Sequence, residues 1–447
     1  MDGTQFGELL RAHRNRRGLT QRQLADLATL SVRAVRNLEL GKAQRPRQET
    51  VRLLSEVLRL NDSRRAELES AAYAPVPVGR RGIGESVAPP APTAPMVGRI
   101  AELDGLMRML TVDGHRSLSI VGLGGVGKTR LALELAGAVH AGCGWPVLWL
   151  PWQALSGREA GGRRLADLPI GRLLPEAAED PRRALAALGP LIGDAQLLLV
   201  IDGSDADGEQ AAAELAGLLQ RCPRLRVVVT SRAPLRTAGE QVVPLGPLAV
   251  PAESVAGAAE LARIDSVRLL VSHVHRFHPG FRLDAATAPA VAAICRRLDG
   301  VPSALAHAAE WFLTEGPADL LALATHSPLI LASSPSGVGQ HADARRHLGR
   351  SLAALPEAGR RVLERMGGRA EPWTVAEAAG PAPDPAGYAE ATRAVHGLLV
   401  HGLLRETADG LRRRFTVLNL VRALTAERPV GAGAGPGAGV PVPVGGV

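Results

Sequence analysis

The sequence predicts a multidomain chain in which an all-α domain is followed by an α/β domain with a doubly wound parallel sheet, and then by mostly helical segments. Three observations support this fold class. Residues 4–72 show the spacing of short amphipathic helices. Apolar runs alternate with helical patterns between residues 96 and 250, and helical spacing returns over residues 251–428. A length of 447 residues is enough for about three domains.

The first domain, residues 1–73, is predicted to hold five short helices. The apolar face of the first helix is formed by Phe6, Leu9, Leu10 and His13. Thr20 is the predicted N-cap of the second helix, and the third helix begins at Ser31 and is stopped by Gly41. Two more helices are predicted over residues 49–60 and 63–73. Residues 74–95 are rich in Pro and Gly, which is typical of a semi-extended linker.

The second domain, residues 96–250, is predicted to contain the parallel sheet. Ser117–Val121 is the first strand, and a helix follows over Thr129–His140. Unbroken apolar runs, as strands buried on both faces require, are found at residues 146–150, 196–202 and 225–231. Residues 240–246 are a candidate fifth strand.

The remainder of the chain is predicted to be helical in two blocks. Residues 251–330 form one helical subdomain, and residues 331–343 form a second linker. Residues 344–428 give helices and a short ribbon. The Gly- and Pro-rich tail at 429–447 is expected to be disordered.

A phosphate-binding motif lies between the first strand and its helix, in the stretch IVGLGGVGKTR at 120–130. It fits G-x4-G-K-[ST] at every fixed position. The glycines let backbone N–H groups turn toward a phosphate, and the helix that follows adds its positive end. The predicted nucleotide-binding residues here are Gly122, Gly124, Gly125, Val126, Gly127, Lys128, Thr129 and Arg130.

Lysine is rare in this chain, since only Lys42 and Lys128 are found among 52 Lys+Arg. A compact ammonium suits a crowded phosphate cradle better than a planar guanidinium does. Lys128 should therefore reach the β- and γ-phosphates of ATP or ADP, and the Thr129 hydroxyl should bind Mg²⁺.

Two further residues are predicted to complete this site. Asp202 ends a buried strand, where it can hold Mg²⁺ through water. Gly203 follows it where many hydrolysing proteins of this architecture have a second acid, so we expect at most a slow ATPase. Arg232 stands at the tip of the strand over 225–231 and can contact a γ-phosphate. The alternatives are that Asp202 caps a turn and that Arg232 is a surface charge.

The order of these parts resembles the NB-ARC group of STAND signalling NTPases over about residues 96–428. Lys128, Asp202 and Arg232 match the family's two Walker positions and its sensor arginine. In the resemblance, Val97, Gly98 and Arg99 of the segment Met96–Leu103 correspond to an entry motif that packs on adenine. Pro302, in the segment Gly300–Leu305, corresponds to a proline that lies against the base or sugar.

The same resemblance implies a winged-helix domain over residues 344–428. Many relatives carry Met-His-Asp where this chain has Phe415–Arg422, and their histidine senses the phosphate of ADP. Leu418 or a neighbour takes the place of that histidine here. Winged-helix closure would then rest on packing alone.

The N-terminal segment resembles Xre-type (lambda-repressor-like) helix-turn-helix domains over about residues 5–70. Leu19–Ala25 is similar to the family's second helix, and Ser31–Glu39 occupies the place of its recognition helix. Val32, Val35 and Leu38 are expected to face the core. The predicted DNA contacts are Gln21, Arg22, Ser31, Arg33, Arg36, Asn37 and Lys42.

Charge and composition agree with a polyanion as partner, although an arginine-rich composition bias would give the same totals. The net charge is +8, and residues 1–72 hold 14 Lys and Arg against 9 Asp and Glu. Three scattered cysteines suggest a reducing cytoplasm and buried thiols. No run of about 18 apolar residues is found, so we expect no membrane span.

These observations predict a cytoplasmic transcriptional regulator that binds a double-stranded DNA operator and is switched by ATP and ADP with Mg²⁺. ATP would favour homo-oligomers. The alternatives are an active ATPase that performs assembly work, and a signalling scaffold whose N-terminal domain contacts protein instead of DNA. The signal that sets the switch would come from a partner protein or from the nucleotide ratio, or else the chain is a fragment. The residues do not decide among these three.

Overall fold

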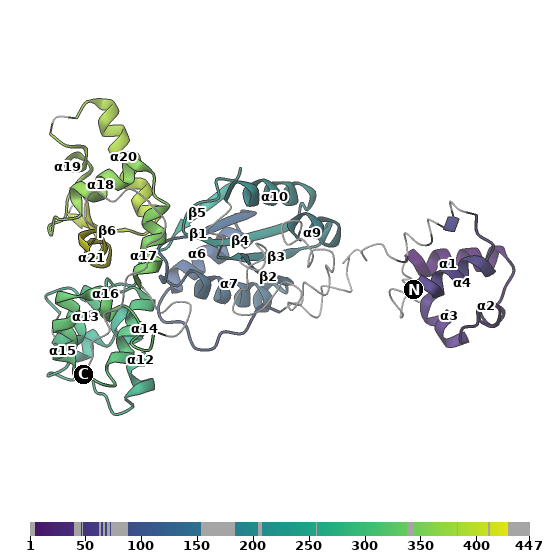
Figure 1. The fold of residues 1–447 in the computed structure, drawn as a ribbon, viewed down its shortest axis with the longest axis horizontal. Coiled ribbons are helices and arrows are strands. Elements are labelled where there is room, and N and C mark those ends of the chain that lie inside the picture. The colour runs from purple at the N-terminus through teal and green to yellow at the C-terminus, as the bar shows by residue number, and fades with distance from the viewer. Residues whose placement is uncertain are drawn as a thin grey trace, which may run out of the picture. The chain divides into compact units, whose positions relative to one another are not determined.

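A computed structural model describes residues 5–39, 46, 48–61, 64–65, 68, 72, 88–152, 184–203, 208–255, 257–337, 344–381, 383–409 and 412–427. The chain divides into two compact units (Figure 1). The first comprises residues 1–79 with the short stretch 190–193, and the second comprises residues 80–189 and 194–447. Each unit is described by itself.

The first unit is a bundle of short helices around its own apolar core. Thr20 caps α2, because its hydroxyl accepts from the N–H of Gln23 while the Gln23 side chain accepts from the N–H of Thr20. Leu10, Leu24, Val35 and Leu54 are fully buried. The helices are α1 (Gln5–Arg16), α2 (Gln21–Leu27), α3 (Val32–Glu39) and α4 (Gln48–Val57).

One expectation for this unit is wrong. Val32 was predicted to face the core, but its side chain is 42% exposed, whereas Val35 and Leu38 are buried. The buried side of α3 continues from Val35 to Glu39, one turn further on, and not back to Val32. Val32 and Leu38 each lie three residues from Val35, so the spacing alone did not show which of them would be buried with it.

The second unit begins with a five-stranded, all-parallel sheet in the order β2-β3-β4-β1-β5, which confirms the predicted α/β fold. Its central strands are buried on both faces. The strands are β1 (Ser117–Val121), β2 (Val147–Pro151), β3 (Leu197–Asp202), β4 (Leu225–Ser231) and β5 (Glu240–Pro244).

Helices cover both faces of this sheet, as a doubly wound fold requires. The chain crosses from β1 to β2 in one direction and returns through β3 to β4 in the other, so right-handed crossovers place α7 and α10 on opposite faces (Figure 1). The helices are α6 (Ile100–Thr111), α7 (Lys128–Cys143), α9 (Ala184–Ile192) and α10 (Gly208–Arg221). α7 is longer than the predicted Thr129–His140.

A helical part follows the sheet and shares its core. Buried side chains run without a break from the sheet into this part and on toward the C-terminus. The helices are α11 (Ala258–Leu261), α12 (Asp265–Phe277), α13 (Ala288–Arg297), α14 (Pro302–Trp311), α15 (Pro317–His326) and α16 (Pro328–Leu331).

The last part has a winged-helix arrangement. The antiparallel strands β6 (Leu404–Asp409) and β7 (Arg412–Val417) form the expected ribbon, and Trp373 pairs with Phe415 of β7. Trp373 is fully buried against that ring. The helices are α17 (Ala344–Ala353), α18 (Glu357–Met366), α19 (Val375–Ala379), α20 (Pro385–Val400) and α21 (Asn419–Glu427).

Several expectations fall wholly or partly outside the described residues: the stop at Gly41, the contact by Lys42, most of the helix over 63–73, residues 74–87 and 338–343 of the two linkers, and the tail at 429–447. Cys143 is exposed, which corrects the expectation of three buried thiols; Cys222 and Cys295 are buried. Among the described helices, none combines the length and the apolar character that crossing a bilayer needs.

Candidate functional site

The phosphate-binding motif forms the turn between β1 and α7, at the carboxyl edge of the sheet. Gly125 and Gly127 have φ of 81° and 102°, a backbone region that favours glycine. Gly125 also has no room for a side chain, since a Cβ there would lie 1.9 Å from Ser303 Oγ. The motif glycines are therefore required by backbone shape and by close approach of another segment.

Lys128 lies within the curve of this turn. Its Nζ donates to the carbonyl oxygens of Gly122 at 2.8 Å and Leu123 at 2.9 Å. The ammonium is thereby held beside the backbone that the motif shapes. Parallel-strand order places the residues after β1, β3 and β4 at this same edge.

Asp202 and Thr129 are brought together across the edge. Asp202 Oδ1 accepts from Thr129 Oγ1 at 2.7 Å and from Thr230 Oγ1 at 2.6 Å. Thr230 Oγ1 in turn accepts from the N–H of Gly203 at 2.9 Å, which fixes the end of β3. A hydroxyl and a carboxylate are hard oxygen ligands, so this pair fits Mg²⁺. In the described part of the chain, no cluster of three or more His, Cys, Asp or Glu side chains could hold a metal alone, and Mg²⁺ commonly keeps water and phosphate ligands.

Arg232 directly follows β4, beside this cluster. Burial lowers the pKa of His401, whose ring forms a hydrogen bond with the Arg232 backbone. That hydrogen bond raises the pKa by less than burial lowers it, and the charge of Arg236 lowers it further.

The segment that resembles the family's proline motif contacts the turn directly. Ser303 donates its N–H to the carbonyl of Gly125 at 3.1 Å. Pro302 begins α14, and its Cγ lies 4.0 Å from where a Cβ on Gly127 would be. The structure therefore places Pro302 close to the glycine-rich turn, and its contact with a base or sugar stays a prediction.

Arg99 and Arg130, two of the predicted nucleotide contacts, have other partners here. Arg99 donates to Glu102 Oε1 at 2.7 Å and to the carbonyl of Gly246 at 2.5 Å. Arg130 pairs with Glu134 at 2.6 Å and donates to the carbonyl of Ala94, at the end of the linker. These guanidinium groups join segments of the second unit to one another. Val97 is half-buried, and Gly98 has φ of 70° with Asp265 against it.

The winged-helix part also contacts the turn, which the sequence did not predict. A Cβ on Gly124 would lie 3.3 Å from the Cβ and 3.4 Å from the Nδ1 of His347, on α17. A Cβ on Gly402, in the turn after α20, would lie 3.1 Å from the N atom of Leu123. Histidine and glycine carry no local signal for such contacts, because the contacts depend on how distant elements pack.

Asp299 joins the helical and winged-helix parts. Its carboxylate accepts from the Leu420 N–H at 2.9 Å and the Asn419 side chain at 3.1 Å, at the start of α21. Its carbonyl accepts from Arg405 at 2.8 Å. Asp299 is 4% exposed, and burial raises its pKa to about 6. This anchor lies four residues before Ser303, which touches the phosphate-binding turn.

Most of the predicted DNA-contacting residues are exposed or half-buried on α2 and α3 of the first unit. Arg33 and Arg36 are exposed on α3, Asn37 is half-buried beside them, and Arg22 is exposed on α2. Ser31 accepts from the N–H of Ala34 at 3.0 Å and so caps α3.

Glu39 is a buried carboxylate that links α3 to α1 and α2, and it was not among the residues predicted from the sequence. It is 5% exposed and accepts from Arg14 Nε at 2.5 Å and Nη2 at 3.0 Å. It also accepts from the Gln21 side chain at 2.6 Å, so this predicted phosphate contact is engaged inside the domain. The sequence did carry one signal for it: Glu39 lies four residues after Val35, at the spacing of residues that share the buried side of α3.

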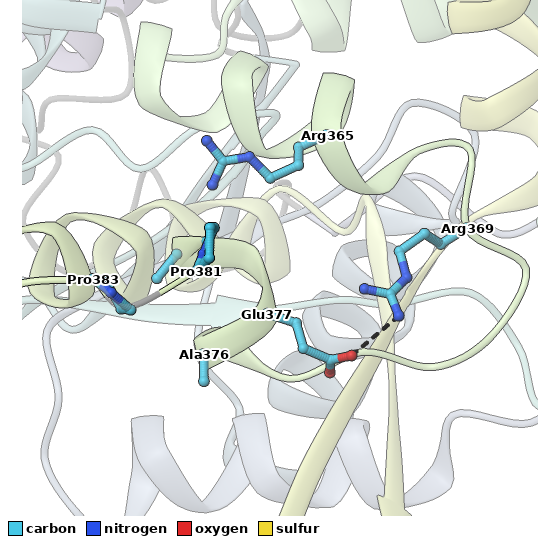
Figure 2. A pocket seen from close by; sticks show the side chains of 8 residues that line it. Arg365, Arg369, Ala376, Glu377, Pro381 and Pro383 are labelled. Atoms are coloured by element: carbon cyan, nitrogen blue, oxygen red, sulfur yellow. Dashed lines mark hydrogen bonds and ion pairs between the residues drawn. The ribbon is translucent and has the colours of Figure 1, made fainter.

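A hollow of about 720 Å³ lies on the winged-helix part, between α18 and α19 (Figure 2). Arg369 and Glu377 face each other across it and pair at 3.1 Å. Arg365 donates to the carbonyl of Ala378 at 2.7 Å. None of the predicted site residues lines this hollow.

A family model supports the N-terminal assignment, and two relatives match about half of the chain. Residues 5–68 match the family model of a helix-turn-helix domain. The chain is 33% identical over 214 residues, 48% of its length, to a Mycobacterium tuberculosis protein named as a candidate HTH-type transcriptional regulator. It is 30% identical over 226 residues to an uncharacterised protein of the same species. The matched part spans 22% and 53% of those proteins, respectively.

A solved structure gives a weaker likeness. A STAND protein with a tetratricopeptide repeat sensor from Pyrococcus horikoshii is 16% identical, with 76% of this chain and 43% of that chain covered and a TM-score of 0.28. The fold class is shown by the sheet order, the motif turn and the element order described above. Residues 5–68 therefore match the helix-turn-helix domain family, and they precede an α/β P-loop fold with helical and winged-helix parts.

Proposed function

We propose that this chain is a cytoplasmic DNA-binding transcriptional regulator whose helical and winged-helix parts are held or released according to the nucleotide at the P-loop. One observation carries the proposal. Three segments from outside the α/β domain, at Ser303, His347 and Gly402, pack against the backbone of residues 122–125. A change of a few tenths of an ångström in that turn would be felt by each of them.

The residues at the turn fit a nucleoside di- or triphosphate. Lys128 and the N-terminal end of α7 would hold the phosphates, and Thr129 with Asp202 would hold Mg²⁺. The ion would supply charge to offset the phosphates. Pro302 would lie against the base or sugar, as in the family that the chain resembles. Arg232 would report a terminal phosphate.

Two states follow from this arrangement. With ADP, the parts around the turn would stay packed as described. ATP with Mg²⁺ would favour release of the winged-helix part and self-association. Self-association would bring several helix-turn-helix domains together and raise the affinity for an operator through effective concentration. A partner protein could bias the same two states.

Hydrolysis is expected to be slow. Gly203 follows Asp202 directly, with φ of 82°, and it provides no side chain to orient an attacking water. The chemistry would therefore reset a switch at intervals and would not drive continuous work.

The test is operator binding by the full chain in the presence of ADP, ATP or a non-hydrolysable ATP analogue. An operator is first selected from random duplexes, and affinity is then measured by fluorescence anisotropy at one salt concentration. We expect tighter binding with the ATP analogue than with ADP, and no nucleotide effect in Lys128→Ala. Nucleotide binding without any effect on DNA affinity would remove the switch, and absence of sequence-selective DNA binding would favour the scaffold alternative.

A further inference from the structure

The recognition helix α3 exposes an apolar side chain among cationic ones. Val32 is 42% exposed, whereas the other apolar residues of α3, Val35 and Leu38, are 0% and 5% exposed. Arg33 and Arg36 on the same helix are also exposed. An exposed valine at this place is therefore not part of the domain core.

Val32 is exposed because of its place at the start of α3. Residues advance by about 100° around a helix, so Val32 shares a side with Val35 and Glu39, which are buried one and two turns further on. Val32 is the first residue of the helix, and Arg36 lies one turn after it. The N-terminal residues of a recognition helix are the ones that contact base edges.

The surroundings of Val32 suit a polyanion with a local apolar group. Two flanking arginines would repel a cationic partner and would lose hydration against an apolar protein surface. In the major groove of DNA, the phosphates offer negative charge, and the C5-methyl group of thymine is the apolar group on the base edges. A valine with two arginines beside it matches that combination.

We propose that Val32 reads the C5-methyl group of a thymine in the operator, flanked by contacts from Arg33 and Arg36. This inference rests on the proposed DNA-binding function and adds the chemistry of one base contact. Each half-site of the operator then contains an A·T pair at a fixed position, and its thymine is distinguished from cytosine and from uracil by the methyl group.

The test replaces single thymines of the selected operator by deoxyuridine, which removes only the methyl group. Affinity of the full chain is measured by fluorescence anisotropy at fixed salt. In the native protein, replacing the one thymine that Val32 contacts in a half-site should weaken binding about fourfold, the factor expected for burial of one methyl-sized group. In Val32→Ala, that penalty should fall to near zero.

Leu27→Ala is the matched control, because Leu27 is 61% exposed but lies at the end of α2, outside α3. It should leave the deoxyuridine penalty unchanged. Thermal melting of each variant checks that the domain is still folded, as truncation of an exposed side chain should allow.

Two outcomes overturn the inference while the proposed function stands. One is sequence-selective binding by the native protein that is indifferent to every deoxyuridine replacement. The other is a penalty of unchanged size in Val32→Ala. Failure of the native protein to select any duplex would refute the proposed function itself, and this inference with it.

Discussion

Asp299 should make the stability of the second unit depend on pH in an unusual direction. Its carboxylate is buried between α13 and α21, with Asn419 and the Leu420 N–H as hydrogen-bond donors and Arg405 and Arg422 as nearby charges. Burial is the largest influence and raises the pKa of Asp299 from 3.8 to about 6. The hydrogen bonds and the two arginines lower it, but less.

The sign follows from the two pKa values. Below pH 3.8 Asp299 is protonated in both the folded and the unfolded chain, and its contribution to the free energy of unfolding is fully present. As pH rises toward 6, the unfolded chain loses the proton first, and the contribution is lost. The gap between 3.8 and about 6, at about 1.4 kcal/mol for each pH unit, corresponds to about 3 kcal/mol.

The assay is urea unfolding of the full chain from pH 4 to pH 7, followed by tryptophan fluorescence, for the native protein and Asp299→Asn. Trp373 is fully buried in the winged-helix part and reports on it. The free energy of unfolding of the native protein, relative to that of the variant, should fall by about 2 kcal/mol across this window, because the unfolded carboxyl is already partly ionised at pH 4. A constant difference would refute the reasoning that a buried, ionisable Asp299 joins the two parts.

Glu377→Gln is a control of opposite sign. A hydrogen bond from the Thr374 backbone, with one from its hydroxyl, holds the pKa of Glu377 below 4.5. The stability that this carboxylate contributes is present above pH 4.5 and is lost as pH falls. The two variants should therefore deviate from the native protein in opposite directions.

Three further predictions concern the two candidate sites. Lys128→Ala should abolish ATP and ADP binding in calorimetry without changing the thermal melt. Lys128→Arg should also bind poorly, because a guanidinium does not fit beside the Gly122 carbonyl. Unchanged affinity in either variant would contradict the role of Lys128 in holding the phosphates. Glu39→Ala should destabilise the first unit by about 3–5 kcal/mol, since Arg14 loses its buried partner. Hydrogen exchange of residues 5–39 in the full chain measures this loss, and unaltered protection would show that the pair is not needed for stability. Arg33→Ala should weaken operator binding by about 1–3 kcal/mol if it reads a base, and an equal loss on all sequences would reduce it to a phosphate contact.

Local patterns were sufficient for most elements. The cap at Thr20, the five strands and the glycine-rich turn before Lys128 each depend on residues close together in sequence. The meeting of Thr129 with Asp202 could also be anticipated, because parallel strands end at one edge of the sheet.

Contacts between distant segments could not be anticipated in this way. The positions of His347 and Gly402 against the turn, and of Asp299 against α21, join residues whose separation in sequence exceeds 100. Arg99 and Arg130 bind carbonyl and carboxylate groups. Such groups are present in many segments, so the sequence does not indicate which segment will provide them.

The sequence by itself determined which residues form each element and which chemical groups stand at the ends of the strands, because backbone propensity and side-chain period are local properties. The tertiary structure alone decided that Glu39 is buried and Val32 exposed, and that the winged-helix part packs on the phosphate-binding turn. The direction in which a side chain faces is set by the free energy of packing one element on another, and that depends on partners far along the chain.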